Sequence, residues 1–272
     1  NIENEKNVEI KVAGIGKTGN NTLNEIIKAV EADFVAVSEK QENLDLSESG
    51  TKILMTKDFE EKMKKALENT DMLFILAETD ETENVKISTA AAKIAQSLEI
   101  LTVSIIAAPS AEEFEKTGKT ELKQFSDIVV TVPSEKISEE IEKIFARDIK
   151  LIVDIIREKG IVNLDFADVN SMLKGGGTAV IAYGTATGEN KENVVEKALN
   201  EILSKNSIKN ARRILMNIVA GPEIGLTELT KITEILEKEL ETEKSCIVWA
   251  YATEPEEGRL SITLIATDFS NE

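Results

Sequence analysis

The first half of the chain alternates short apolar runs with segments of helical periodicity, such as Leu23, Ile26 and Val30. The apolar runs are rich in Val, Ile, Leu and Phe and are predicted to be strands: 8–13, 34–37, 72–77, 101–107 and 127–132. Continuous apolar strands separated by helices are typical of a parallel sheet covered on both faces, because each crossover places its helix on one face. The pattern therefore predicts a doubly wound α/β domain over residues 1–137.

One helical pattern then runs unbroken over residues 138–159, a length of roughly 33 Å at about 1.5 Å per residue. Gly160 ends this pattern, and a loop leads to a cluster of three glycines at 175–177. A helix of this length can cross a whole domain. Residues 138–174 are therefore predicted to be a central helix and loop that connect two domains.

The remaining residues, 175–272, are predicted to form an α+β domain. Strand and helix patterns alternate at 178–186, 194–203, 213–219 and 226–240, followed by two late strands at 246–253 and 260–267. The loop between the late strands, 254–259, contains Pro and Gly. This loop predicts an antiparallel hairpin.

Composition excludes several classes of protein. The 32 Lys and Arg against 50 Asp and Glu give a net charge of −18, which repels phosphate backbones and anionic lipid, so we expect no nucleic-acid partner. The chain has no His and one cysteine, Cys246, which removes imidazole bases, His-activated nucleophiles and Cys/His metal sites; no metal is expected. No apolar run approaches the ~20 residues of a membrane span. We expect a cytoplasmic protein without direct membrane insertion.

A glycine-rich loop lies between the first predicted strand and helix. Gly14, Gly16 and Gly19 form G-x-G-x-x-G, in which backbone N–H groups at a helix start can bind phosphate. Glu39, about 20 residues on, could bind a ribose hydroxyl, as in dinucleotide enzymes. A tight strand-to-helix turn explains the glycines equally well. The P-loop pattern is excluded because Lys11 stands where its first glycine is needed.

Six segments in one order resemble motifs of a single family. They are KVAGIGKTGNNTLN (11–24), FVAV (34–37), VNLDFADV (162–169), GTATGEN (184–190), ILMNI (214–218) and ITLIATDF (262–269). Together they resemble FtsZ, the bacterial relative of tubulin, from residue 8 to residue 269. The segment 162–169 is similar to the synergy loop of that family almost letter for letter. The resemblance implies a tubulin/FtsZ-like fold with an N-terminal α/β domain, a long central helix and an α+β C-terminal domain.

The resemblance also implies a site in two parts. It places GTP or GDP on the first domain, with Gly14, Gly16, Gly19 and Asn21 as the phosphate loop. It makes Asp165 and Asp168 the synergy-loop carboxylates, which act on the nucleotide of the next subunit in a head-to-tail filament. The implied partners are FtsZ-type subunits, either copies of this chain or a paralogue.

The residues alone allow two interpretations of the synergy-loop carboxylates. Two carboxylates three positions apart at a helix start can polarise a water molecule or hold a cation. They can also cap the helix that follows, with Phe166 in the core. The two interpretations remain open at this point.

The chain departs from the family at the G-G-G-T-G-T-G loop, which wraps the nucleotide phosphates. The ungapped alignment between Met72 and Ala95 places D-E-T-E-N-V-K, residues 80–86, at those positions. Glu78, Asp80, Glu81 and others would then face a polyanion. At about 6 Å and an effective dielectric constant of about 20, each like-charge pair costs about 3 kcal/mol before salt screening. Micromolar affinity amounts to only about 8 kcal/mol, so we expect no bound cofactor.

Three functions remain open. The leading hypothesis is an FtsZ-like cell-division or cytoskeletal protein that lacks efficient GTP binding of its own and acts by head-to-tail interaction with filament subunits. The first alternative is an atypical FtsZ GTPase that still binds GTP or GDP and polymerises. The second is a Rossmann-type dinucleotide enzyme that uses the same glycines and Glu39.

Overall fold

The computed structural model describes residues 7–108, 120–204, 208–239 and 246–269. The chain divides into two compact units, Asn1–Val153 and Asp154–Glu272. The three-part division at residues 137 and 174 stays a prediction. Each unit contains its own sheet and is described by itself.

The first unit is built on a parallel sheet with the strand order β3-β2-β1-β4-β5-β6. Its strands are β1 (Ile10–Ile15), β2 (Asp33–Ser38), β3 (Thr51–Leu54), β4 (Met72–Glu78), β5 (Leu101–Ala108) and β6 (Ile128–Pro133). Its helices are α1 (Gly16–Ile26), α2 (Gln41–Asp45), α3 (Phe59–Ala66), α4 (Thr82–Ser97) and α6 (Thr120–Phe125). The doubly wound sheet predicted from the alternating pattern is confirmed.

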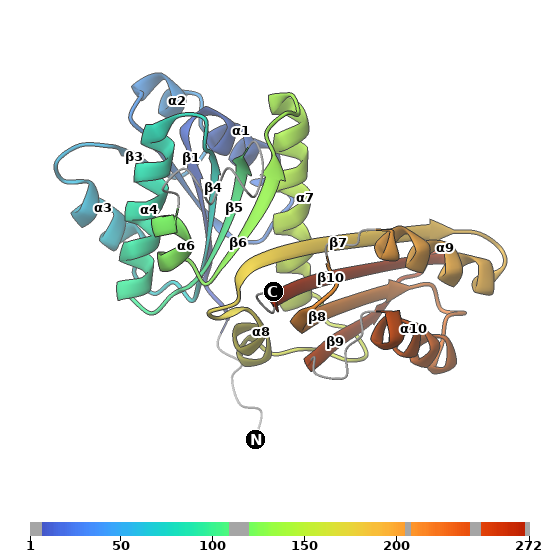
Figure 1. Ribbon diagram of the computed structural model, residues 1–272. Coiled ribbons are helices and arrows are strands. Elements are labelled where there is room, and N and C mark those ends of the chain that lie inside the picture. Colours follow the sequence, from blue (N-terminus) through green and yellow to red (C-terminus); the bar gives the residue numbers. More distant parts are fainter. Residues whose placement is uncertain (1–6, 109–119, 205–207, 240–245, 270–272) are drawn as a thin grey trace. The chain divides into compact units, whose positions relative to one another are not determined.

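Helices lie on both faces of this sheet (Figure 1). On one face, α3 and α4 bury Phe59, Met63 and Ala91 against strand residues such as Ile75. On the other face, α1 contacts β1, β2 and β4. Nearly every residue of β4 and β5 is buried, which agrees with their continuous apolar sequence. The sheet therefore presents its loops, rather than its faces, to a ligand.

Three features of the first unit differ from the sequence prediction. The edge strand β3 and the short helix α2 were not predicted, because a four-residue edge strand and a single helical turn carry little periodicity. The alanine-rich sequence predicts a helix over residues 88–98, whereas helix α4 begins six residues earlier, at Thr82. Its added first turn holds Glu83 and Lys86, which hide the helical apolar pattern.

The second unit has the strand order β7-β10-β8-β9. Its strands are β7 (Gly177–Thr187), β8 (Ala211–Ala220), β9 (Cys246–Thr253) and β10 (Arg259–Phe269). Its helices are α8 (Phe166–Leu173), α9 (Lys191–Leu203) and α10 (Leu226–Glu239), while α7 (Ser138–Arg157) runs through the boundary between the units. Helices α9 and α10 lie on one face of the sheet (Figure 1). The core between them includes Leu199, Ile232 and Ile262.

The predicted hairpin of the last two strands is wrong. Strand β10 pairs antiparallel with both β7 and β8, whereas β9 pairs parallel with β8 at the edge of the sheet. The loop after Thr253 thus passes over β8 instead of turning back on β9. Burial gives the reason: most of β10 is buried on both faces, so it requires a central position, while β9 is mostly half-exposed. Cys246 is exposed at the start of β9.

No helix among the described residues is long and apolar enough to cross a membrane.

Tyr251 forms a buried side-chain hydrogen bond in the core of the second unit. Its ring is 4% exposed, and its hydroxyl donates to the Ile224 carbonyl oxygen at 2.8 Å. We expect Tyr251→Phe to lower the free energy of urea-induced unfolding by about 1 kcal/mol, because a buried carbonyl loses its donor. Tyr183→Phe is the control, since the Tyr183 hydroxyl lies 3.5 Å from the Ser261 hydroxyl and is only half-buried. Equal losses in both variants would contradict this assignment.

Candidate functional site

The candidate nucleotide edge lies at the carboxyl ends of β1, β2 and β4. The strand order reverses direction between β1 and β4, and open α/β sheets bind ligands at such a switch point. Helix α1 begins at Gly16, directly after β1, and α4 begins at Thr82, four residues after the end of β4. The two helix starts therefore meet at the position where the family resemblance predicts a nucleotide.

The three glycines of the phosphate loop are required by packing. A Cβ atom at Gly14 would lie 2.5 Å from the Gly19 carbonyl oxygen, and one at Gly19 would lie 2.6 Å from the Leu76 carbonyl oxygen. Both glycines thus let α1 approach the backbone of β1 and β4. Gly16 has φ +70°, and a Cβ there would lie 2.6 Å from Oδ1 of Asn84. The tight-turn interpretation accounts for all three glycines without a ligand.

A carboxylate lies against the first turn of α1. The Thr18 hydroxyl donates to Oε2 of Glu78 at 2.6 Å, and Glu78 is the last residue of β4. Burial raises the pKa of the Glu78 carboxyl above its ordinary value, against the hydrogen bond from Thr18, and the charges of Asp80, Glu142 and Glu81 add to the increase. The N-cap residue of α1, Ile15, provides no side-chain oxygen for the helix start. Negative charge therefore surrounds this helix terminus.

The asparagines of α1 bind other parts of the first unit. Asn20 is 2% exposed and donates to the carbonyl oxygens of Gly16 and Val37, which ties α1 to β2. Nδ2 of Asn21 donates to Oε1 of Glu142 at 2.9 Å. Asn24 donates to the Leu46 carbonyl and accepts from the Glu48 amide. Asn21, predicted as a phosphate-loop residue, thus has a carboxylate as its partner.

The segment 80–86, which the sequence predicts to align with the family's glycine loop, leads into the start of α4 at Thr82. Residues 82–86 are helical, and Glu81 is the N-cap residue, with no side-chain hydrogen bond to the helix. Nζ of Lys40, in the loop after β2, lies 3.1 Å from Oε1 of Glu81. This half-exposed ion pair joins the loops that follow β2 and β4. Glu39, the predicted ribose-binding residue, is exposed beside it.

The synergy-loop carboxylates form a capping box at the start of α8. Oδ1 of Asp165 accepts from the Asp168 amide at 2.8 Å, and Oδ2 of Asp168 accepts from the Asp165 amide at 3.2 Å. Val169 is fully buried and Phe166 is half-buried. Both aspartates are exposed. The capping role is therefore present, and each carboxylate keeps an oxygen outside the box.

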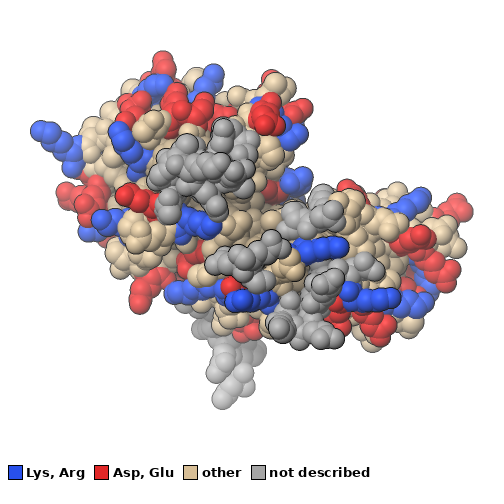
Figure 2. Space-filling view, viewed as in Figure 1, with Lys and Arg blue, Asp and Glu red and all other residues tan. Residues whose placement is uncertain are grey.

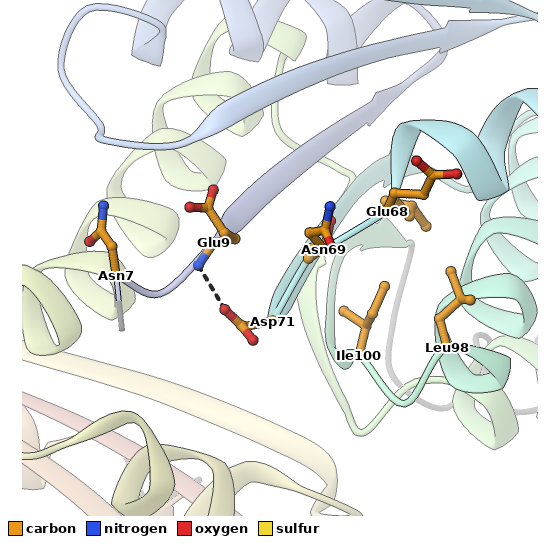
Figure 3. A pocket seen from close by; sticks show the side chains of 9 residues that line it. Asn7, Glu9, Glu68, Asn69, Asp71, Leu98 and Ile100 are labelled. Carbon is orange, nitrogen blue, oxygen red and sulfur yellow. Dashed lines mark hydrogen bonds between the residues drawn. The ribbon is translucent and has the colours of Figure 1, made fainter. Parts of the chain in front are cut away.

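A separate cavity of about 760 Å³ lies at the opposite, amino edge of the first sheet (Figure 3). It is lined by residues that include Glu9, Asp71 and Ile100, and the Glu9 amide donates to Oδ2 of Asp71 at 2.9 Å. Strands β1, β4 and β5 begin at this edge, whereas the glycine loop follows the end of β1. This cavity is therefore separate from the candidate nucleotide edge.

Sequence reasoning missed Glu142 as a member of the site. Glu142 lies on α7 and is 8% exposed, beside the buried residues Ile141 and Phe145. Phe145 and Ile149 follow Glu142 by three and seven residues, so the Glu142 carboxylate lies on the apolar face of the helix. A carboxylate on an apolar face was the available signal. Its partner Asn21 is 121 residues away, which no local pattern indicates.

Metal binding finds no support in this geometry. Within residues 7–108, 120–204, 208–239 and 246–269, no group of three or more His, Cys, Asp or Glu side chains is arranged to hold a metal ion. The expectation of no metal stays a prediction.

Comparison with known proteins identifies the class of fold. Residues 177–270 match the family model described as FtsZ family, C-terminal domain. An FtsZ mutant from M. jannaschii matches with a TM-score of 0.82 and 21% identity, over 96% of this chain and 91% of that one. An empty FtsZ dimer from M. jannaschii matches at 0.80 and 22%, over 97% and 89%. TubZ of Bacillus thuringiensis serovar israelensis, in GDP-form protofilaments, matches at 0.75 and 10%, over 97% and 87%.

The fold is that of the tubulin and FtsZ proteins, as the six motifs predicted. Residues 177–270 match the FtsZ C-terminal domain, and the whole chain has the fold of the FtsZ structures. The comparisons do not favour the Rossmann-type dinucleotide enzyme.

The packing role of Gly19 can be tested with one methyl group. We expect Gly19→Ala to lower the free energy of unfolding by about 2 kcal/mol, because the new Cβ meets backbone that cannot move aside. Gly50→Ala is the matched control: no atom lies within 4 Å of its added Cβ, so the change should stay within about 0.5 kcal/mol. Urea denaturation measures both. A neutral Gly19→Ala would show that α1 does not need this close approach.

The raised pKa of Glu78 predicts a pH-dependent cost. The protonated Glu78 carboxyl makes its full contribution to the free energy of unfolding below the ordinary pKa of 4.5. This contribution is lost as the pH rises through the higher pKa of the folded state. Glu78→Gln should therefore be more stable than the unmodified chain at pH 7, with the difference shrinking toward pH 4. Denaturant titrations across this range measure it. Exposed Glu25→Gln is the control, and the same profile in that variant would refute the prediction.

Proposed function

We propose that this chain is a cell-division or cytoskeletal protein that lacks efficient GTP binding of its own and docks through its synergy loop onto the nucleotide end of an FtsZ-type subunit. The single observation that carries the proposal is the Glu78 carboxylate against the first turn of α1. An FtsZ-type nucleotide would place its phosphates at this helix start.

Backbone conformation at the start of α4 supports the loss of GTP binding. A glycine loop can wrap phosphates because its N–H groups are free to point inward. Here residues 82–86 are helical and carry side chains. The Asn84 amide lies against Gly16 and occupies the space between the two helix starts. A nucleotide would have to displace this amide.

Electrostatics supports the same conclusion. The charges of Asp80, Glu81 and Glu142 disfavour the ionised form of the Glu78 carboxyl. Of these four acidic residues, Lys40 forms an ion pair with Glu81. A triphosphate would add negative charge to a site whose carboxylate already has a raised pKa. The electrostatic cost of binding a triphosphate here rises as the surroundings exclude water, because the local dielectric constant falls.

The synergy loop supports docking on a neighbour. Asp165 and Asp168 are exposed, and the capping box holds both side chains in a fixed geometry. Each carboxylate uses one oxygen in the box and keeps its negative charge. In the proposed contact, these carboxylates act on the nucleotide of the neighbour.

Charge favours a paralogue over a second copy as that neighbour. A second copy would present Glu78, Asp80 and Glu81 to the Asp165 and Asp168 carboxylates, and like charges at an interface suppress pairing. The chain would then accept no further subunit on its own nucleotide edge. It would act as a cap or modulator of filaments.

One observation favours the alternative of an atypical GTPase. Gly14, Gly16 and Gly19 keep the strand-to-helix turn of the phosphate loop, and the first turn of α1 has no N-cap side chain. Its amide groups retain the geometry that binds anions at helix starts.

Nucleotide titration separates the two functions. We expect the purified chain to show no saturable binding of fluorescent GTP with Mg²⁺ up to about 100 μM, because fewer than about 6 kcal/mol would remain. Fluorescence anisotropy measures this, with an ordinary FtsZ as the positive control. Saturation in the micromolar range would establish the atypical GTPase instead.

Docking can be tested while the cap of α8 is preserved. The double variant Asp165→Asn, Asp168→Asn keeps side-chain oxygens that accept the capping hydrogen bonds but removes both charges. We expect its unfolding free energy to change by less than about 1 kcal/mol and its co-sedimentation with GTP-assembled FtsZ to fall several-fold. Undiminished co-sedimentation would remove the synergy loop from the interface, and absence of co-sedimentation by the unmodified chain would refute docking itself.

A further inference from the structure

A groove between α9 and α10 lies outside the sites described above. It encloses about 270 Å³, and its lining includes Val195, Leu199 and Leu203 from α9 and Ile235 from α10. Ile235 is 40% exposed, which is unusual for a large apolar side chain on a helix that already buries Ile232 and Leu236 in the core. Val195 and Leu199 belong to the core and form the floor of the groove, whereas Leu203 and Ile235 are its partly exposed apolar side chains.

The two helices are held together at their first turns. Nζ of Lys191 lies 2.7 Å from Oε1 of Glu228, and Oε2 of Glu228 accepts from the Gly225 amide at 3.0 Å. The hydrogen bond from Lys191 lowers the pKa of the Glu228 carboxyl below its ordinary value, despite burial. Both oxygens of the Glu228 carboxylate therefore have partners, and these contacts hold the two helices together at one end of the groove.

The apolar residues of α9 form a line along the groove. Val195, Leu199 and Leu203 follow one another at four-residue spacing, which spans ~12 Å of helix. The cavity is smaller than the ~300–1,000 Å³ of most small-molecule sites. A line of this length matches the anchors that an amphipathic helix presents at i, i+3 or i+4, and i+7. The shape thus fits anchoring side chains of a partner helix.

The acidic side chains at the rim of the groove favour a partner helix with basic side chains. Glu192 and Glu196 line the groove, and within the part of the chain that the structure describes neither forms an ion pair or hydrogen bond. Figure 2 shows acidic side chains over α9 and α10 with basic side chains among them. Lys231 also lines the groove. Free carboxylates beside an apolar line attract Lys or Arg side chains and repel anionic surfaces.

We propose that the α9/α10 groove binds a basic amphipathic helix of a partner protein, with its apolar side chains on Leu203 and Ile235 above the floor of Val195 and Leu199, and its basic side chains at Glu192 and Glu196. A second copy of this chain is a poorer occupant, because each copy carries a net charge of −18 and the copies repel one another. The groove and its occupant are independent of nucleotide binding and of the synergy loop.

The test uses the full chain and a defined probe. The probe is a fluorescein-labelled peptide of about 15 residues, with leucines at i, i+4 and i+7 and lysines on the opposite face, long enough to form a helix on binding. A peptide with glutamates in place of the lysines is its control. We expect saturable anisotropy with the lysine peptide and at least about tenfold weaker binding of the glutamate peptide.

Variants of the chain locate the binding. Glu192→Lys with Glu196→Lys should weaken binding of the lysine peptide at least tenfold, and Ile235→Glu should do the same, since all three residues line the groove. Glu234→Lys is the matched control, because Glu234 is exposed on α10 but does not line the groove. It should change binding less than twofold. Circular dichroism of each variant shows that the fold is kept.

Three results would overturn the proposal. The first is absence of saturable binding by the unmodified chain. The second is equal binding by the groove variants and Glu234→Lys. The third is concentration-dependent dimerisation of the unmodified chain, abolished by Ile235→Glu, which would assign the groove to a second copy.

Discussion

The first unit depends on the close approach of α1 to β1 and β4. Gly14 and Gly19 leave no room for a Cβ atom, so the helix packs backbone against backbone. This contact fixes the start of α1 at the switch point of the sheet. The positions of Thr18 against Glu78 and of Asn21 against Glu142 follow from it. A fold can therefore keep a phosphate-loop geometry for packing reasons alone, whatever its ligand.

The two predicted halves of the site differ in what the structure supplies for them. The candidate nucleotide edge carries the Glu78 and Glu142 carboxylates, the Asn84 amide and the Lys40–Glu81 ion pair. The synergy loop keeps two exposed carboxylates in a defined geometry. This asymmetry is the physical basis of the proposal that the chain docks on filament subunits.

Periodicity and burial determine how much of the fold and of the candidate site could be predicted from the sequence. Strands β1, β2, β4, β5 and β6 follow from their apolar runs, because burial leaves a clear local pattern, whereas the short edge strand β3 does not. The pairing of β10 with β7 and β8 was missed, since strand neighbours depend on contacts between distant segments. Capping by Asp165 and Asp168 was one of the two interpretations that the sequence left open, and it could be formulated because it is local. The Asn21–Glu142 contact was not, because nothing in either segment specifies the other.

The half-buried position of Glu78 has one more consequence. A carboxyl whose pKa is raised by burial holds its proton to a higher pH than a solvated one, so its negative charge is conditional. Any repulsion of anions by the edge of the sheet must then weaken as the medium acidifies. The repulsion of phosphate that we propose for this edge would therefore depend on the proton concentration around it.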